Sequence, residues 1–269
     1  ESPLGDIELR EGSFSGGFHE STSTMPACDV VLVALKTTSN HLLATLLPPL
    51  VGEHTTVVML QNGLGVEAEA ADVVGGAHVV GGMCFLCSNK VGPGHVRHLD
   101  YGLVTLADFG PGGRSRGITS AMSAIGQDFA RTRGVPITLE EDLTSARWRK
   151  LVWNIPFNGL SVVLDAATNE LMADAASRAL AAALIEEVVA GGSACGAVMP
   201  AAFTEQMLGS TTAMKPYMTS MKLDHDAGRP LEIEAMYGRP LGAATLAVAE
   251  MPLTTMLYRE LGFIDARLR

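Results

Sequence analysis

Cysteine and basic residues are both scarce in this sequence. Four cysteines in 269 residues are too few for a disulfide framework, which favours a reducing compartment and makes the cytoplasm the default location. The net charge is −10 and the lysines and arginines are scattered singly, so no basic stripe is available to neutralise a nucleic-acid backbone. We therefore expect no nucleic-acid partner, although a local site could still bind a small acid.

Long apolar runs and metal-ligand spacings are also missing. No stretch of about 18 apolar residues is free of charges or turn residues, and no basic start followed by an apolar middle opens the sequence, so neither a membrane span nor a signal peptide is expected. Cys84 and Cys87 have the spacing of a zinc or redox pair, but no second cysteine or histidine pair accompanies them. We therefore expect no metal and no membrane partner.

The apolar content, 47%, is enough for the core of one large domain or two ordinary ones. In the first half of the chain, residues 29–35 form a short run rich in β-branched residues, which is typical of a strand covered on both faces. Similar patterns predict strands at 55–60, 78–82 and 135–139, helices at 41–47 and 115–132, and a hairpin within 83–107 that turns at Gly92-Pro93-Gly94. This alternation of strands and helices predicts a parallel sheet that becomes mixed at one end, where the hairpin lies.

The second half of the chain has a different character. After Glu140 the strand patterns end, and helical patterns rich in alanine, leucine and methionine continue. Glycine or proline breaks separate helices predicted at 144–164, 177–194, 203–226 and 231–249. We therefore predict a boundary near Thr144, between an α/β domain of residues 1–143 and an all-helical domain of residues 144–269.

One predicted helix carries polar residues that suggest chemistry. Lys150, Asn154 and Asn158 recur every fourth residue among Trp, Leu, Val, Ile and Phe, and this spacing advances only about 40° per step, so the three share one face. They could form an ordinary solvated stripe. Amides in place of the usual surface charges, and Pro156 inside the helix, argue for a site instead. An ammonium among apolar side chains could protonate a developing alkoxide.

Two further polar residues follow predicted parallel strands. Lys36 comes after the strand at 29–35, and Asn62-Gly63 after the strand at 55–60. Ligands of open α/β sheets bind at the carboxyl ends of the strands, so both residues are candidates for a binding site. The alternative is that Lys36 lies on the surface and Asn62-Gly63 is an ordinary turn.

Several blocks of the sequence, in the same order, resemble the signature blocks of the ketopantoate reductase (2-dehydropantoate 2-reductase) family. The resemblance spans essentially the whole chain and is more specific for the family than for the substrate. The matching blocks are Asp29–Thr37, Gln61–Gly65, Gly92–His98, Arg147–Leu151 and Ser220–Glu234.

The resemblance implies an enzyme that transfers hydride from NADPH to a 2-oxoacid, most directly ketopantoate, in the pathway to pantothenate. Lys150 matches the family's general acid, and Asn154 and Asn158 match its substrate-binding amides. Ser220 matches the serine that binds the substrate carboxylate, and Glu232 the glutamate that contacts the cofactor and orients the active site.

The remaining implied contacts lie beside the nicotinamide. Asn62 matches a residue that contacts both substrate and cofactor, Lys36 matches a cofactor contact, and Ser88 lies about where the family contacts the carboxamide. A further substrate-binding asparagine of the family aligns with Thr168, next to Asn169, so that contact is either shifted by one residue or lost. A homodimer is a possible assembly.

The front of the sequence departs from the family pattern. A dinucleotide enzyme of this kind opens with a strand, a Gly-x-Gly-x-x-Gly turn and a helix that holds the pyrophosphate, and no such turn is present. We interpret the cluster of glycines at 110–113 as a connection. The segment 1–6 resembles the family's chain after its second strand, so roughly 45 to 55 residues of the first βαβ unit are expected to be missing. Without that unit, NADPH binding should be far weaker.

These observations predict a Rossmann-like domain without its first unit, followed by a helical domain that supplies the acid and most substrate contacts. Two alternatives stay open. One is a related reductase of another branched 2-oxoacid. The other is a non-catalytic protein that binds a small acid, because the nucleotide-binding turn is absent.

Overall fold

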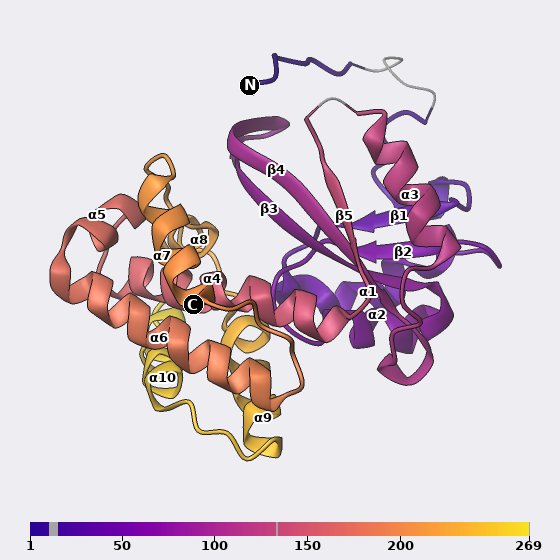
Figure 1. The fold of residues 1–269 in the computed structure, drawn as a ribbon. Helices are drawn as coiled ribbons and strands as arrows, with labels where there is room; N and C mark the ends of the chain where they lie inside the picture. The colour runs from indigo at the N-terminus through magenta and orange to yellow at the C-terminus, as the bar shows by residue number, and fades with distance from the viewer. Residues whose placement is uncertain (11–15, 133, 269) are drawn as a thin grey trace. The chain divides into compact units, whose positions relative to one another are not determined.

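The computed structural model of the chain describes residues 1–10, 16–132 and 134–268. The chain divides into two compact units, which differ in colour and content in Figure 1. Unit 1 consists of Glu1–Gln61 and Val66–Leu143, and unit 2 of Asn62–Gly65 and Thr144–Arg269. The short loop Asn62–Gly65 therefore belongs to unit 2, although the residues on either side of it belong to unit 1.

In the described residues, unit 1 contains a five-stranded mixed sheet in the order β1-β2-β3-β4-β5. β1, β2 and β3 are parallel, β4 is antiparallel to β3, and β5 is parallel to β4, which confirms the predicted mixed end. The hairpin between β3 and β4 turns at Gly92-Pro93-Gly94, as predicted. The strands are β1 Val30–Val33, β2 Thr56–Met59, β3 Val79–Gly92, β4 His95–Phe109 and β5 Ile137–Glu140.

Helices cover both faces of this sheet. α2 (Val66–Val74) packs on β2 and β3, and its Glu67 comes so close to Gly81 of β3 that any side chain there would collide with the carboxylate. α3 (Ser120–Ala130) packs on β4 and β5, with Met122 against the other face. A partly parallel sheet with helices on both faces is a Rossmann-like architecture, so the predicted fold class is confirmed.

The prediction that the first strand is covered on both faces is wrong for the described residues. Val31 and Val33 of β1 are buried, but Val30 and Leu32, on the opposite face, are exposed. α3, the helix on that face, packs on β4 and β5, which lie across the sheet from β1. The apolar composition of a strand therefore does not by itself show that both of its faces are covered.

The remaining segments of unit 1 are short. α1 (Leu43–Leu46) lies between the 3-10 turns Thr37–Leu42 and Pro48–Leu50, in place of the single helix predicted at 41–47. α3 begins later than predicted because Thr119 accepts a hydrogen bond from the amide of Met122, as an N-cap does. α2 was not predicted. The glycine cluster at 110–113 forms a connection between β4 and α3, as expected.

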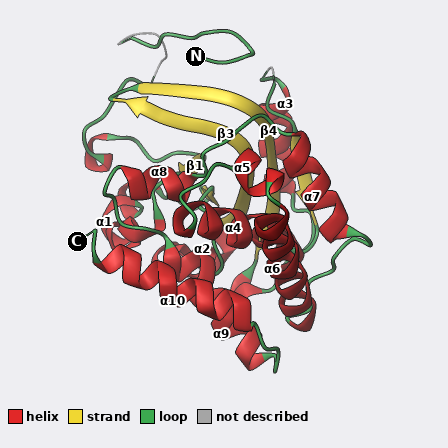
Figure 2. Cartoon of the chain, turned by 90° about the vertical axis from the view of Figure 1, so that its left-hand side faces the viewer, coloured by secondary structure: helices red, strands yellow, loops and turns green. Residues whose placement is uncertain are grey.

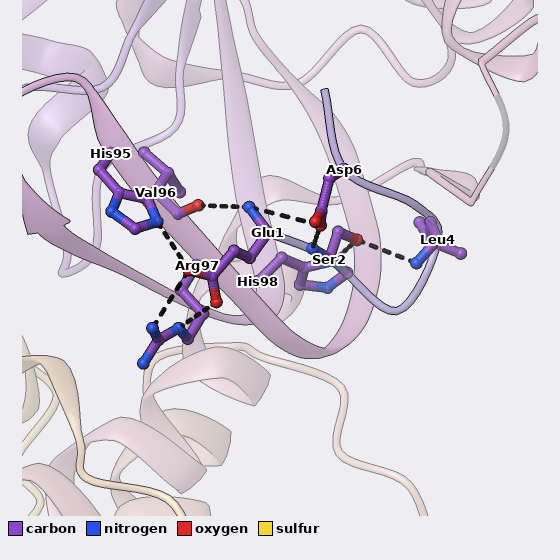
Figure 3. Close-up of polar contacts among 8 residues, drawn as sticks. All are labelled: Glu1, Ser2, Leu4, Asp6, His95, Val96, Arg97 and His98. Atoms are coloured by element: carbon purple, nitrogen blue, oxygen red, sulfur yellow. Dashed lines mark hydrogen bonds and ion pairs between the residues drawn. The ribbon is translucent and has the colours of Figure 1, made fainter. Parts of the chain in front are cut away.

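The first residues of the described chain lie along β4 (Figure 3). The Glu1 carboxylate accepts hydrogen bonds from Arg97, 2.7 Å from Nε, and contacts His95 Nε2 at 3.0 Å. The Ser2 hydroxyl lies 3.0 Å from Nδ1 of His98. The hydrogen bond from Arg97 is the main reason that the pKa of Glu1 lies below its usual value. Polar contacts thus join segment 1–6 to the start of β4.

The described part of unit 2 outside the loop Asn62–Gly65 is helical, as predicted (Figure 2). Its core is built around α4, whose Trp148, Leu151, Ile155 and Phe157 are almost completely buried. Within the described residues, none of the helices is long and apolar enough to span a bilayer. The helices are α4 Leu143–Val163, α5 Thr168–Ala173, α6 Ala175–Ala194, α7 Phe203–Ala213, α8 Ser220–Asp226, α9 Arg239–Leu246 and α10 Pro252–Ala266, with a π-helical turn at Glu234–Gly238.

Two of the predicted helices are interrupted. The segment 203–226 forms α7 and α8 rather than one helix, because Pro216 lies in the extended stretch between them and cannot continue a helical ladder. The segment 231–249 begins irregularly, passes through the π-helical turn and continues as α9, which has Pro240 in its first turn. α5 and α10 were not predicted.

Candidate functional site

The polar face of α4 is buried rather than solvated. Lys150, Asn154 and Asn158 are only 9%, 2% and 1% exposed, although each follows its predecessor by one helical turn, as the sequence spacing requires. The interpretation of this face as a solvated stripe is therefore wrong. Buried amides are retained where they have hydrogen-bond partners or bind a ligand, because an unpaired buried amide is costly.

The middle of α4 is held by a residue that the sequence analysis did not single out. The Tyr237 hydroxyl donates a hydrogen bond to the carbonyl oxygen of Ile155, next to Pro156, at 2.9 Å. Burial raises the pKa of Tyr237, which keeps the hydroxyl protonated as a donor. A side chain at Gly159 would collide with this hydroxyl and with Leu257. A tyrosine in an apolar helical pattern is typical of a core residue, so nothing in the sequence marked it.

Asn62 joins the polar face of α4 from the loop after β2. Its side-chain oxygen accepts a hydrogen bond from Nδ2 of Asn154, with a donor–acceptor distance of 3.3 Å. The loop is fixed in unit 2 by the amide of Leu64, which donates to the carbonyl of Ala235 at 2.9 Å. Gly63 has a φ of +95°, and a Cβ there would lie 2.6 Å from Ala235, so glycine is required. The predicted turn Asn62-Gly63 is thus hydrogen-bonded to the polar face of α4.

Ser220 approaches the same face from the first turn of α8. The side-chain oxygen of Asn158 accepts a hydrogen bond from the amide of Met221 at 3.2 Å, and the Ser220 hydroxyl lies 3.5 Å from it. Thr219 caps the helix by accepting a hydrogen bond from the amide of Lys222. A serine hydroxyl and a buried amide thus lie side by side, and both can bind a carboxylate or hydroxyl oxygen.

Glu232 is buried, with 4% exposure, in the irregular stretch before the π-helical turn. Its carboxylate is therefore not part of the solvent-exposed surface of the unit. The preceding amide, of Leu231, donates to Oδ1 of Asp265 in α10 at 2.8 Å, which fixes the backbone beside Glu232. A carboxylate buried in this unit is a candidate for interaction with a buried cation or a ligand hydroxyl.

Lys36 and Ser88 both lie in unit 1. Lys36 is exposed and directly precedes the 3-10 turn after β1. Gln61 donates hydrogen bonds to the carbonyl of Leu35 and to Oδ1 of Asn40, at 2.9 and 2.6 Å, and so ties this turn to the end of β2. Ser88 lies at a bulge in β3, opposite His98. Both cofactor contacts stay predictions.

Thr168, which aligns with a further substrate-binding asparagine of the family, has the surroundings of a buried structural residue. Thr168 is completely buried, and its hydroxyl accepts a hydrogen bond from the amide of Tyr217, whose carbonyl in turn accepts from the amide of Thr168. The neighbouring Asn169 is exposed. Thr168 thus joins α5 to the stretch between α7 and α8.

A Rossmann-like unit and a helical unit with a buried lysine and neutral amides on one helix face define a class of nicotinamide-dependent oxidoreductases. The family model of ketopantoate reductase PanE/ApbA matches residues 10–111, and the model of its C-terminal part matches residues 142–265. The chain belongs to the ketopantoate reductase family.

Individual relatives agree with this assignment. The chain is 50% identical over 266 residues to a 2-dehydropantoate 2-reductase of Nostoc sp., a match that covers 98% of the chain and 83% of that protein. The crystal structure of 2-dehydropantoate 2-reductase from Geobacter metallireducens has a TM-score of 0.89 at 38% identity, covering 97% of this chain and 84% of that one. D-mandelate dehydrogenase in complex with NADH shares the fold, with a TM-score of 0.77 at 19% identity over 90% of this chain and 80% of that one. That neighbour binds NADH, a nicotinamide cofactor.

Proposed function

We propose that the chain reduces the ketone of 2-dehydropantoate to the alcohol of pantoate, with NADPH as the reductant. The observation that carries this proposal is the buried polar face of α4, on which Lys150 accompanies the amides of Asn154 and Asn158. Hydrogen bonds add Asn62 and Ser220 to this face. A proton donor among neutral amides suits a substrate that has one ketone, one hydroxyl and one carboxylate.

The chemistry of the donor set also fits the nicotinamide end of the cofactor. The side chain of Asn62 has both a donor and an acceptor, as recognition of a carboxamide requires, and Glu232 can accept from a hydroxyl. We assign cofactor contacts to Lys36, Asn62, Ser88 and Glu232. When bound, the reduced nicotinamide supplies the hydride.

The residues of unit 2 then have distinct roles. The Lys150 ammonium donates a proton to the ketone oxygen as negative charge develops there, which yields the alcohol. Its Nζ lies 5.9 Å from the centroid of the Trp153 ring, and this aromatic face favours the charged form. Ser220 and Asn158 hold the carboxylate, and Asn62 and Asn154 orient the substrate without competing for the proton. Glu232 supports the protonated lysine.

Steady-state kinetics on the protein expressed from its complete coding sequence tests this proposal. Loss of NADPH absorbance is followed with 2-dehydropantoate and with branched 2-oxoacids that lack its hydroxyl, and each assay is repeated with NADH. We expect the highest kcat/KM for 2-dehydropantoate with NADPH. A higher value for another 2-oxoacid would identify a different reductase of the same family. Tight NADPH binding without turnover of any 2-oxoacid would indicate a non-catalytic binding protein.

A further inference from the structure

The end of α4 has an unusual residue in a left-handed conformation. The amide of Ala166 donates to the carbonyl of Ser161 at 3.1 Å, and the amide of Asp165 donates to that of Val162 at 3.3 Å. This pair of hydrogen bonds is a Schellman motif, and it places Asp165 at the position that follows the C-cap, with a φ of +51°. Glycine is the usual residue there, because a Cβ is strained in this conformation.

Two other helices of unit 2 end in the same motif with the usual residue. Gly196 follows α6 with a φ of +87°, and Gly228 follows α8 with a φ of +63°. The fold therefore uses glycine at this position after α6 and α8, whereas α4 has an aspartate and α9 has Val248 in the left-handed conformation. Local strain in a native structure persists where the surrounding structure compensates for it, and such positions are often near functional sites.

The compensation at Asp165 is an ion pair with a buried lysine. Nζ of Lys222 in α8 lies 2.8 Å from Oδ1 of Asp165 and also contacts the carboxylate of Asp226. The Lys222 side chain is 4% exposed and that of Asp165 is 86% exposed, so a buried ammonium lies beneath a solvated carboxylate. Burial lowers the pKa of Lys222, but hydrogen bonds to the two carboxylates outweigh this effect and leave the pKa above its usual value.

This ion pair and the candidate carboxylate site join the same two helices. In its first turn α8 contacts Asn158 of α4, through the amide of Met221 and the hydroxyl of Ser220. Asp165 follows the end of α4, and its separation from Asn158 in the sequence corresponds to about two helical turns, or roughly 10 Å along the helix axis. The side chain of Lys222 reaches it from the residue directly after Met221. Two attachments of this kind fix both the rotation and the axial position of α8 on α4.

We propose that Asp165 and Lys222 form a positioning pair, which holds the Ser220 hydroxyl against Asn158 so that both can bind the carboxylate of the 2-oxoacid. This inference rests on the proposed function. Asp165 need not touch substrate or cofactor. It acts through Lys222 and the backbone of α8, and this explains why the fold has a strained, charged residue where glycine would be easier to accommodate.

Asp165→Gly is the most direct test, because it removes the carboxylate and relieves the backbone strain at once. We expect the KM for the 2-oxoacid to rise about five- to tenfold, while kcat changes less than about twofold and NADPH affinity is unchanged. Lys222→Met removes the other partner with an apolar chain of similar length and should give the same pattern. Hydrogen exchange of the Met221 amide should become faster in both variants.

Val248→Gly is the matched control for the backbone change. Val248 ends α9 in a Schellman motif with a φ of +57°, and its side chain is exposed, so this variant also replaces a left-handed residue by glycine. Its KM should equal that of the wild type. An unchanged KM and unchanged Met221 exchange in both Asp165→Gly and Lys222→Met overturn the positioning role. A wild-type protein that reduces no 2-oxoacid refutes the proposed function instead, and the hydrogen-exchange result still decides whether the pair holds α8.

Discussion

At the scale of single residues, the proposed chemistry depends on Lys150, whose own helix face carries amides rather than carboxylates. Lys150, Asn154 and Asn158 are all buried, and hydrogen bonds extend this set to Asn62 and Ser220. Neutral amides orient a polar ligand without taking the proton that the ammonium must donate. The role of Lys150 can therefore be tested separately from binding.

Lys150→Met should lower kcat about 100-fold or more, because the side chain keeps its volume but can no longer donate a proton. NADPH affinity and the melting temperature should be nearly unchanged. Stopped-flow and steady-state measurements of NADPH oxidation give kcat, and Lys215→Met, at an exposed lysine of the same unit, serves as the control. A folded Lys150 variant with a near-normal kcat would rule out this residue as the acid.

Val248 allows a prediction about stability. It is a β-branched residue with a φ of +57° and is 94% exposed. It follows the C-cap of α9, a position at which glycine is the usual residue. Val248→Gly should raise the free energy of unfolding by about 1 kcal/mol, because the relief of strain exceeds the added freedom of the unfolded chain. Gly196→Ala, at the equivalent position after α6, should lower it by about 1 kcal/mol. Thermal unfolding of both variants measures the difference, and a destabilised Val248→Gly protein would contradict it.

At the scale of elements, helix ends decide how the chain changes direction around the site. α4 and α8 end in Schellman motifs, and α3, α6 and α8 begin at N-cap residues whose side chains accept a backbone hydrogen bond. Such ends satisfy backbone groups that would otherwise lack partners. These caps also fix the residues at which the helices begin and end. The N-cap Thr219, for example, starts α8 where the amide of Met221 can donate to Asn158.

The N-cap of α6 makes stability depend on pH. Oδ1 of Asp174 accepts a hydrogen bond from the amide of Ser177 at 2.8 Å, and this bond is the main reason that the pKa of Asp174 lies below its usual value. A carboxyl group with a lowered folded-state pKa adds stability at neutral pH, which is lost as the pH falls through that pKa. Asp174→Ala should therefore lower the melting temperature at pH 7 and have little effect at about pH 2.

Asp174→Asn is the control for this pH dependence. Asparagine also caps helices well but does not titrate, so its melting temperature should stay close to that of the wild type at pH 7. If Asp174→Ala lost the same stability at both pH values, the capping carboxylate would not be the cause.

At the scale of the whole molecule, two units with different architectures supply different groups. Unit 1 has the mixed sheet and Lys36, whereas unit 2 has the lysine, the amides and Glu232. A cofactor that binds only the folded protein stabilises it by RT ln(1 + L/Kd), where L is the free cofactor concentration, which is about 2.7 kcal/mol when L is 100 times Kd. Cofactor preference is therefore measurable as a shift in melting temperature, without substrate.

In the protein expressed from its complete coding sequence, NADPH should raise the melting temperature more than NADH at equal concentration. Differential scanning fluorimetry over a concentration series gives an apparent Kd for each. The Lys150→Met variant, which lacks the proposed acid but keeps the proposed cofactor contacts, should show the same two shifts. Equal shifts with both nucleotides would contradict the proposed preference for NADPH.

The sequence by itself determined the five strands, the change to helical patterns after Glu140 and the contents of the α4 face, but not α2, α5 or α10. Periodicity is a local property, so the strands at β2 and β5 and the shared face of Lys150, Asn154 and Asn158 follow from spacing alone. The family blocks added the proposed roles of Ser220 and Glu232. Periodicity shows which residues share a face, but it does not show what covers that face, so the solvated and buried alternatives for α4 could not be separated in advance.

Only the tertiary structure decided which residues meet across long distances in the chain. The hydrogen bond between Asn62 and Asn154 joins residues of the two halves of the chain, and the pairs Tyr237 with Ile155 and Lys222 with Asp165 join different segments of unit 2. Such contacts depend on how helices end and pack, and these geometries are set by many weak interactions at once. The left-handed conformation of Asp165 shows this most clearly, because its residue type suggests an ordinary surface aspartate and only its backbone and its buried partner reveal a structural role.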